Sequence, residues 1–265
     1  MGAPARSYSR YVALGDSSTE GLDDPYPGGG YRGWADRLAE RLAELEPGLL
    51  YANLGVRGRL AGQVRETQLG PALALQPDLA SVVAGMNDLL RPRCDVAAVA
   101  GQLDAMLAAL VAAGATVLTC TLPDPVPVMP ITRPLRPRLL GLNAALRQAA
   151  ARHGAVLVDF GADRAASDPR LCGVDRLHAN AAGHARIAAR FAAALDLPER
   201  DEPPPAAVLP DARQRPHAVV AAELAWSGRY LAPWVVRRLR GRSSGDGRLA
   251  KRPQLQPIAR ATDPA

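Results

Sequence analysis

The sequence predicts an α/β fold built on a parallel β-sheet of five strands. Short apolar segments alternate along the chain with longer segments whose apolar residues recur at helical spacing. Such alternation is typical of parallel strands joined by right-handed helical crossovers. Glycine and polar residues directly follow several apolar segments, and in parallel sheets the loops after the strands meet at one edge. We therefore expect one domain over residues 1–197, with its functional residues at the carboxyl ends of the strands.

The predicted strands are short apolar runs, and the predicted helices have longer periodic patterns. The strands cover residues 11–14, 49–54, 79–84, 116–122 and 156–160. The helices cover residues 34–46, 96–113, 138–153 and 181–195, with a weaker one within 60–75. Trp34 and Leu38 begin an apolar stripe of four-residue spacing on the first helix. Gly114 and Gly154 are expected to end two helices, and Asn180 is the expected N-cap of the last one.

The composition of the chain changes after residue 197. Residues 198–217 begin with a proline-rich and acidic stretch and are predicted to be a linker. Residues 218–265 form a basic C-terminal extension that we expect to be part helical and part disordered. The disorder is predicted for residues 241–265, which are polar and rich in glycine and proline.

The positive charge of the chain is concentrated in this extension. The isoelectric point is about 9.7. Residues 1–198 contain 20 basic and 19 acidic residues, whereas residues 199–265 contain 12 and 7. A nearly neutral body argues against phosphate recognition by the domain itself, so we expect no nucleic-acid partner.

The helix expected in the extension has an aromatic stripe formed by Trp226, Tyr230 and Trp234, with several arginines beside it. One interpretation is an interfacial helix that makes weak contact with a membrane surface. The other is that the stripe packs on the body or on a second subunit. The apolar stretch is short and is interrupted by Pro233, which favours packing. No feature of the sequence predicts an oligomeric state.

The sequence also indicates a compartment. It has no apolar run of the roughly 18 residues that a membrane span needs, and residues 1–10 lack the apolar core of a signal peptide. The three cysteines (Cys94, Cys120 and Cys172) have no metal-binding spacing and suggest no disulfide framework. We therefore expect a cytoplasmic protein without a metal or another cofactor.

Four short motifs carry the residues that are suited to chemistry. Three of them follow the first three predicted strands, and the fourth precedes the last helix. In chain order they are Gly15-Asp16-Ser17-Ser18, Asn53-Leu54-Gly55, Gly85-Met86-Asn87-Asp88 and Asp175-Arg176-Leu177-His178. A serine hydroxyl is a weak nucleophile unless a base takes its proton, and the base needs a third group to orient it. The first and last motifs supply Ser17, His178 and Asp175 for these three tasks.

Taken together, the motifs resemble those of the SGNH (GDSL-type) hydrolase family, over residues 11–195. The resemblance implies a flavodoxin-like three-layer α/β/α sandwich and the hydrolysis of esters or thioesters. It implies that Ser17 attacks the acyl carbon, that His178 is the general base and that Asp175 orients the imidazole.

The resemblance also implies an oxyanion hole made of the Ser17 N–H, the Gly55 N–H and the Asn87 side-chain amide. The chain departs from the family pattern at Ser18, where leucine is common, and at Ala179, where proline is common. Neither change removes a reacting group, so both bear on substrate preference.

One competing motif lacks its context. Gly28-x-Gly30-x-x-Gly33 matches a dinucleotide-binding fingerprint, but no strand precedes it, and we interpret residues 23–33 as a loop over the site.

The residues therefore predict a serine esterase or lipase-type hydrolase that acts on a small acyl ester through an acyl-enzyme. Two alternatives remain, an acyltransferase that uses the same site and a non-catalytic binding module. We expect the loops at 23–33 and 123–137 to shape the pocket.

Overall fold

The structure, a computed structural model, describes residues 7–198, 224–240 and 242–258. Its centre is a six-stranded sheet with the strand order β5-β4-β3-β1-β2-β6. The strands are β1 (Arg10–Gly15), β2 (Leu50–Asn53), β3 (Leu79–Val83), β4 (Thr116–Thr121), β5 (Val156–Asp159) and β6 (Arg252–Pro257). The first five are parallel to one another, and β6 pairs antiparallel with β2.

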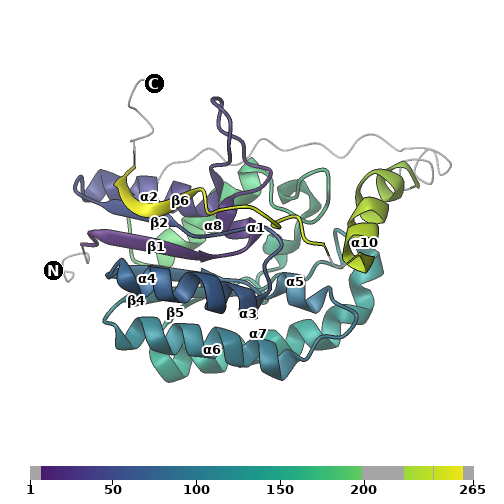
Figure 1. The fold of residues 1–265 in the computed structure, drawn as a ribbon, viewed down its shortest axis with the longest axis horizontal. Coiled ribbons are helices and arrows are strands. Elements are labelled where there is room, and N and C mark those ends of the chain that lie inside the picture. The colour runs from purple at the N-terminus through teal and green to yellow at the C-terminus, as the bar shows by residue number, and fades with distance from the viewer. Residues whose placement is uncertain (1–6, 199–223, 241, 259–265) are drawn as a thin grey trace.

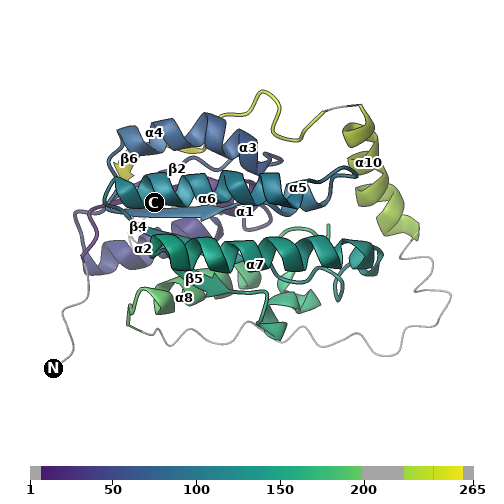
Figure 2. The same cartoon turned by 90° about the horizontal axis from the view of Figure 1, so that it is seen from below.

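Helices cover both faces of this sheet (Figures 1 and 2). On one face lie α2 (Gly33–Leu45) and α8 (Ala181–Ala194). On the other lie α6 (Val96–Ala112), α7 (Arg136–His153) and a chain of short helical segments, which are α3 (Ala61–Val64), the π-helical η1 (Arg65–Leu69) and α4 (Gly70–Ala74). Alternate residues of β1 feed two separate cores, because Tyr11 and Ala13 pack on one side and Val12 and Leu14 on the other. The expected three-layer α/β/α sandwich is confirmed.

The local signals in the sequence also agree with the structure. The Asn180 side chain accepts a hydrogen bond of 3.0 Å from the Gly183 N–H and so caps α8. Gly154 ends α7 in the left-handed conformation, which glycine adopts at little cost. The weak helix expected at 60–75 is divided into three segments by the π-helical turn of η1.

The prediction of five strands was wrong, and so was the prediction of disorder for residues 242–258. Residues 242–258 are described, and β6 adds a sixth, antiparallel strand to the edge of β2. Ile258 is buried in the core beside α2, which a disordered segment would leave exposed. Composition indicated disorder because the segment has no periodic apolar pattern of its own. Its order comes instead from the unpaired backbone groups of an edge strand.

Part of the C-terminal extension is helical, as expected. Residues 224–240 form a helix that contains the π-helical η5 (Ser227–Leu231) and α10 (Ala232–Leu239). Pro233 lies within this helix, two residues after the π-helical turn ends at Leu231. Most of the predicted linker at 198–217 lies outside the described residues. Within the described residues, no helix combines the length and the apolar character that crossing a bilayer demands.

Candidate active site

Ser17 lies at the start of a short helix directly after the central strand β1. This helix, α1 (Ser17–Glu20), is capped by Asp16, whose side chain accepts a hydrogen bond of 3.1 Å from the Ser18 N–H. Asp16 is buried, and this burial raises the pKa of Asp16 to about 6. The cap therefore fixes the backbone that carries the Ser17 hydroxyl.

The residue before this cap has to be glycine. A Cβ on Gly15 would lie 2.2 Å from Thr19 Oγ1 and 2.3 Å from the Val83 carbonyl oxygen. Gln68, which belongs to η1, holds the backbone of Gly15 on both sides. Its side chain accepts a hydrogen bond from the Gly15 N–H at 2.8 Å and donates one to the Gly15 carbonyl at 2.9 Å. The loop after β1 is thus fixed by sterics and by two buried hydrogen bonds.

His178 connects Ser17 to Asp175. Its Nε2 lies 2.9 Å from Ser17 Oγ, and its Nδ1 lies 2.5 Å from Asp175 Oδ2. The other oxygen of Asp175 accepts from the N–H groups of Leu177 and His178 at 2.9 and 3.0 Å. The structure therefore brings Ser17 to the Asp175–His178 pair, although 161 positions of sequence separate Ser17 from His178.

The charges around the imidazole favour its protonated form. Burial disfavours the imidazolium, but the hydrogen bond and the charge of Asp175, together with the charges of Asp23 and Asp16, raise the pKa of His178 above its ordinary value. Burial alone would raise the pKa of Asp175, and the hydrogen bond and charge of His178 lower it instead. The pair is therefore arranged to stabilise a positive charge that develops on His178.

Asn87 lies opposite the nucleophile on α5 (Met86–Leu89), the short helix after β3. Its amide donates to Asp16 Oδ2 at 3.0 Å and to the Arg59 carbonyl at 3.2 Å. The Asp16 carboxylate thus holds both the serine loop and the Asn87 amide.

Gly55 does not reach the site as the resemblance implied. Its N–H donates to Asn53 Oδ1 at 3.0 Å, and Gly55 lines neither of the two chambers described below. Three residues later, Gly58 has the left-handed φ of 74° and shares a chamber with Ser17 and Asn87. Sequence reasoning missed Gly58, although a second glycine in the loop after β2 was the available signal.

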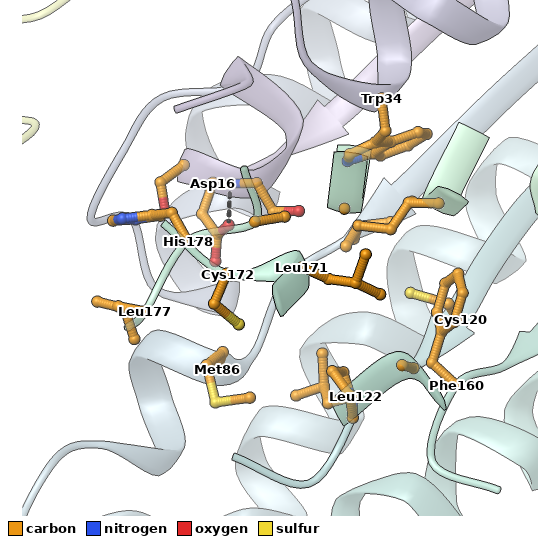
Figure 3. A pocket seen from close by; sticks show the side chains of 18 of the residues that line it. Asp16, Trp34, Met86, Cys120, Leu122, Phe160, Leu171, Cys172, Leu177 and His178 are labelled. Atoms are coloured by element: carbon orange, nitrogen blue, oxygen red, sulfur yellow. Dashed lines mark hydrogen bonds between the residues drawn. The ribbon is translucent and has the colours of Figure 1, made fainter. Parts of the chain in front are cut away.

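Two chambers meet at the Ser17 hydroxyl. Both are lined by Ser17, Asn87, Leu177 and His178. The inner chamber has a volume of about 180 Å³ and runs between the carboxyl edge of the sheet and α8. Apolar side chains surround it, as Figure 3 shows for most of them, and the main ones are Trp34, Cys120, Leu122, Phe160, Leu171 and Phe191. Several of these belong to the buried core, so the inner chamber penetrates the body of the protein.

The outer chamber is larger, about 410 Å³. The loop predicted at 123–137 lines it through Met129, Ile131 and Leu135, among others, and the C-terminal extension adds a second wall. The loop predicted at 23–33 contributes no lining residue to either chamber. A bridge between Pro25 and Tyr31 closes that loop into a hairpin that projects from the body (Figure 1).

Asp23 adds a second carboxylate beside the histidine. Its backbone has a φ of 66°, and burial and the charge of Asp175 raise the pKa of its side chain. Asp23, Asp175 and His178 offer ligand atoms within 4.8 Å of one another, as a metal site would. A metal ion there would have to displace a hydrogen bond of His178, because both ring nitrogens are already engaged.

Comparison with known families identifies this arrangement. The model of the GDSL-like Lipase/Acylhydrolase family matches residues 13–186, which is well over half of the chain. The chain belongs to this family. It is a carboxylic ester hydrolase, and the resemblance to SGNH hydrolases inferred from its motifs is confirmed.

Solved structures of a hydrolase and of two esterases share the fold. An alpha/beta hydrolase enzyme from the metagenome of Lake Arreo, Spain, is 24% identical, with a TM-score of 0.61 over 72% of this chain and 97% of that chain. An acetylxylan esterase from Geobacillus stearothermophilus is 18% identical, with a TM-score of 0.62 over 76% of this chain and 100% of its own. The psychrotrophic esterase EstA from Pseudoalteromonas sp. is also 18% identical, with a TM-score of 0.57 over 71% and 97% of the two chains. No match was found among curated proteins.

Proposed function

We propose that this GDSL-family hydrolase cleaves acyl esters through an acyl-enzyme on Ser17. His178 Nε2 takes the proton of the Ser17 hydroxyl as Oγ attacks the carbonyl carbon, and then gives it to the leaving alcohol. Asp175 holds the imidazole tautomer and stabilises its cation. Water then attacks the acyl-enzyme with His178 again as the base, which releases the acid and restores Ser17. The observation that carries the proposal is the hydrogen-bonded chain Ser17–His178–Asp175, with links of 2.9 and 2.5 Å.

The oxyanion of the tetrahedral intermediate needs donors that are already in position. We assign this task to the Ser17 N–H, to the Asn87 amide held by Asp16, and to a backbone N–H of the loop after β2. Gly58 replaces Gly55 in this assignment, because Gly58 lines the outer chamber together with Ser17 and Asn87, whereas Gly55 lines neither chamber.

The inner chamber favours an ester with an aliphatic acyl group. It begins at Ser17, and its walls are mainly hydrocarbon, sulfur and aromatic rings, with polar side chains around Ser17 and at Arg186. Burying each methylene group there contributes about 0.8 kcal/mol, or roughly fourfold in specificity. A chain of several carbons therefore gains more from this site than an acetyl group does.

Hydrolysis of p-nitrophenyl butyrate tests the proposal. The wild-type protein should release butyrate and should react with a fluorophosphonate probe at Ser17. Ser17→Ala should lose about 10⁴-fold or more of the activity and all of the labelling. Ser167→Ala, a serine outside both chambers, is the matched control and should behave like wild type. Full activity of Ser17→Ala would end the proposal. With glycerol present, butyrylglycerol in excess of free butyrate would identify an acyltransferase instead.

A further inference from the structure

The C-terminal helix forms one wall of the outer chamber. Trp226, Tyr230 and Arg237 line the chamber from this helix, and Ser244 lines it from the segment that follows. All four lie beyond residue 186, where the family match ends. Figure 2 shows α10 beside the end of the body that carries α5. This wall is therefore a feature of this chain rather than of the part that the family model describes.

The wall is attached to two of the loops that carry the proposed catalytic groups. Trp226 Nε1 donates to the Val174 carbonyl at 2.9 Å, and the Arg176 guanidinium lies 4.5 Å from the centre of the Trp226 ring. These contacts join the helix to the segment that holds Asp175. At the other end, Ser243 Oγ donates to the Gly58 carbonyl at 3.2 Å. The wall therefore has a defined position relative to Ser17.

The charged groups in the outer chamber do not balance. Arg57 is paired with Glu20, since its Nε lies 2.9 Å from a Glu20 oxygen, and Asp175 is paired with His178. Arg237 is exposed and, among the described residues, has no carboxylate partner. The chamber thus has one surplus positive charge among the described residues, and the hydroxyl groups of Tyr230 and Ser244 line the same chamber. A guanidinium with neighbouring hydroxyl donors is suited to phosphate or carboxylate oxygens.

We propose that the outer chamber binds the alcohol portion of the ester and that Arg237 recognises an anionic group on it, a phosphate or a carboxylate. The inference rests on the proposed function and names the substrate class of the same site. The two chambers divide the ester, because the inner chamber is lined mainly by apolar side chains that suit the acyl chain, and the Arg186 guanidinium that also lines it is paired with Asp163. The leaving alcohol then lies in the outer chamber, beside the wall that carries Arg237.

Two butyryl esters that differ in one phosphate group test this assignment. The probes are 1-butyrylglycerol and 1-butyrylglycerol 3-phosphate, assayed by release of butyrate at low salt. The wild-type protein should prefer the anionic ester by about tenfold in kcat/KM, as expected for hydrogen bonds to a charged group. Arg237→Gln should remove most of this preference. Arg240→Gln is the matched control, because Arg240 is an exposed arginine of the same helix that does not line the chamber.

The outcomes separate the two levels of the inference. The anion site would be overturned by equal kcat/KM values for the two esters, or by an equal loss of preference in Arg237→Gln and Arg240→Gln. In either case, Ser17-dependent hydrolysis of the neutral ester would still uphold the proposed function. Failure to hydrolyse either ester would overturn both. A third arm uses vesicles of phosphatidylglycerol. An effect of Arg237→Gln on the soluble ester indicates a free anionic substrate, and an effect on the vesicles alone indicates a lipid headgroup.

Discussion

The body of the protein and its C-terminal extension contribute to the same site in different ways. In the body, the polar groups at the centre are buried and cross-linked, and Asp16, Ser17 and Asn87 are only 4%, 8% and 7% exposed. In the extension, the helix that faces Ser17 presents exposed side chains such as Arg237, and few hydrogen bonds hold it. The difference indicates that the proposed catalytic groups are fixed by the part of the chain that the family model matches, whereas a segment outside that match forms a wall of the outer chamber.

The largest effect is expected in the body, from Asn87→Ala. Loss of one preorganised oxyanion donor should lower kcat by about 10²–10³-fold with little change in KM. Steady-state kinetics with p-nitrophenyl butyrate measures this. Asn180→Ala removes the cap of α8 and should lower stability by about 1 kcal/mol while kcat stays unchanged. A fall in kcat of less than tenfold for Asn87→Ala would contradict its place in the oxyanion hole.

The next effect is expected in the extension, from Lys251→Met. Lys251 Nζ lies 2.8 Å from the Asp36 carboxylate, which is almost fully buried, and it also donates to the Tyr31 and Arg32 carbonyls. Removal of the cation leaves a buried charge without its ion-pair partner, so the free energy of unfolding should fall by about 3 kcal/mol. Urea titration measures this, with the exposed Arg248→Met as control. A change below about 1 kcal/mol would show that the last strand is only loosely attached to the body.

Filling the inner chamber should give a smaller, selective effect. Leu171 is one of the lining side chains in Figure 3, and the larger tryptophan in Leu171→Trp should fill part of the chamber. The ratio of kcat/KM for octanoate to that for acetate should fall about tenfold or more, since roughly two methylene groups lose their site. Leu140→Trp, on the exposed side of α7, is the control. An equal loss on both esters would mean that the acyl chain does not enter this chamber.

The smallest effect concerns pH. His178 must be neutral to accept the Ser17 proton, so kcat/KM falls as the pH drops through its pKa. That pKa is raised above its ordinary value, in part by the negative charge of Asp23. Asp23→Asn removes this charge, and the acidic limb of the pH–kcat/KM profile should move to lower pH. Asp163→Asn, which removes a carboxylate that pairs with Arg186 and is not among the charges raising the pKa of His178, should leave the limb in place. A limb that stayed in place in Asp23→Asn, or moved upward, would contradict the assignment of this limb to His178.

The sequence predicted the parts of the site that depend on strand ends. Ser17, Asn87 and the Asp175–His178 pair lie where short apolar strands stop or where a capped helix begins, and such boundaries are local properties of the chain. The choice between Gly55 and Gly58 was different. It depends on which N–H is already bonded within the turn, and the Asn53 side chain decides that only in the folded loop.

The contribution of the extension could not be predicted in the same way. The strand at Arg252–Pro257 has no apolar alternation, and it forms because the edge of β2 is available to it. Likewise, Trp226 and Tyr230 formed a stripe with two interpretations in the sequence. The structure places both of these side chains at the outer chamber, and Trp226 is held there by a hydrogen bond to Val174, 52 positions away.

The central claim is that an acyl group becomes attached to Ser17. It is tested most directly by quenching the enzyme in acid during turnover of p-nitrophenyl butyrate and mapping the butyryl group by peptide mass spectrometry. The account predicts a butyryl ester on the peptide that contains Ser17, with no adduct in Ser17→Ala. Sustained turnover by the wild-type protein with the butyryl group on another residue, or undiminished turnover by Ser17→Ala, would contradict it.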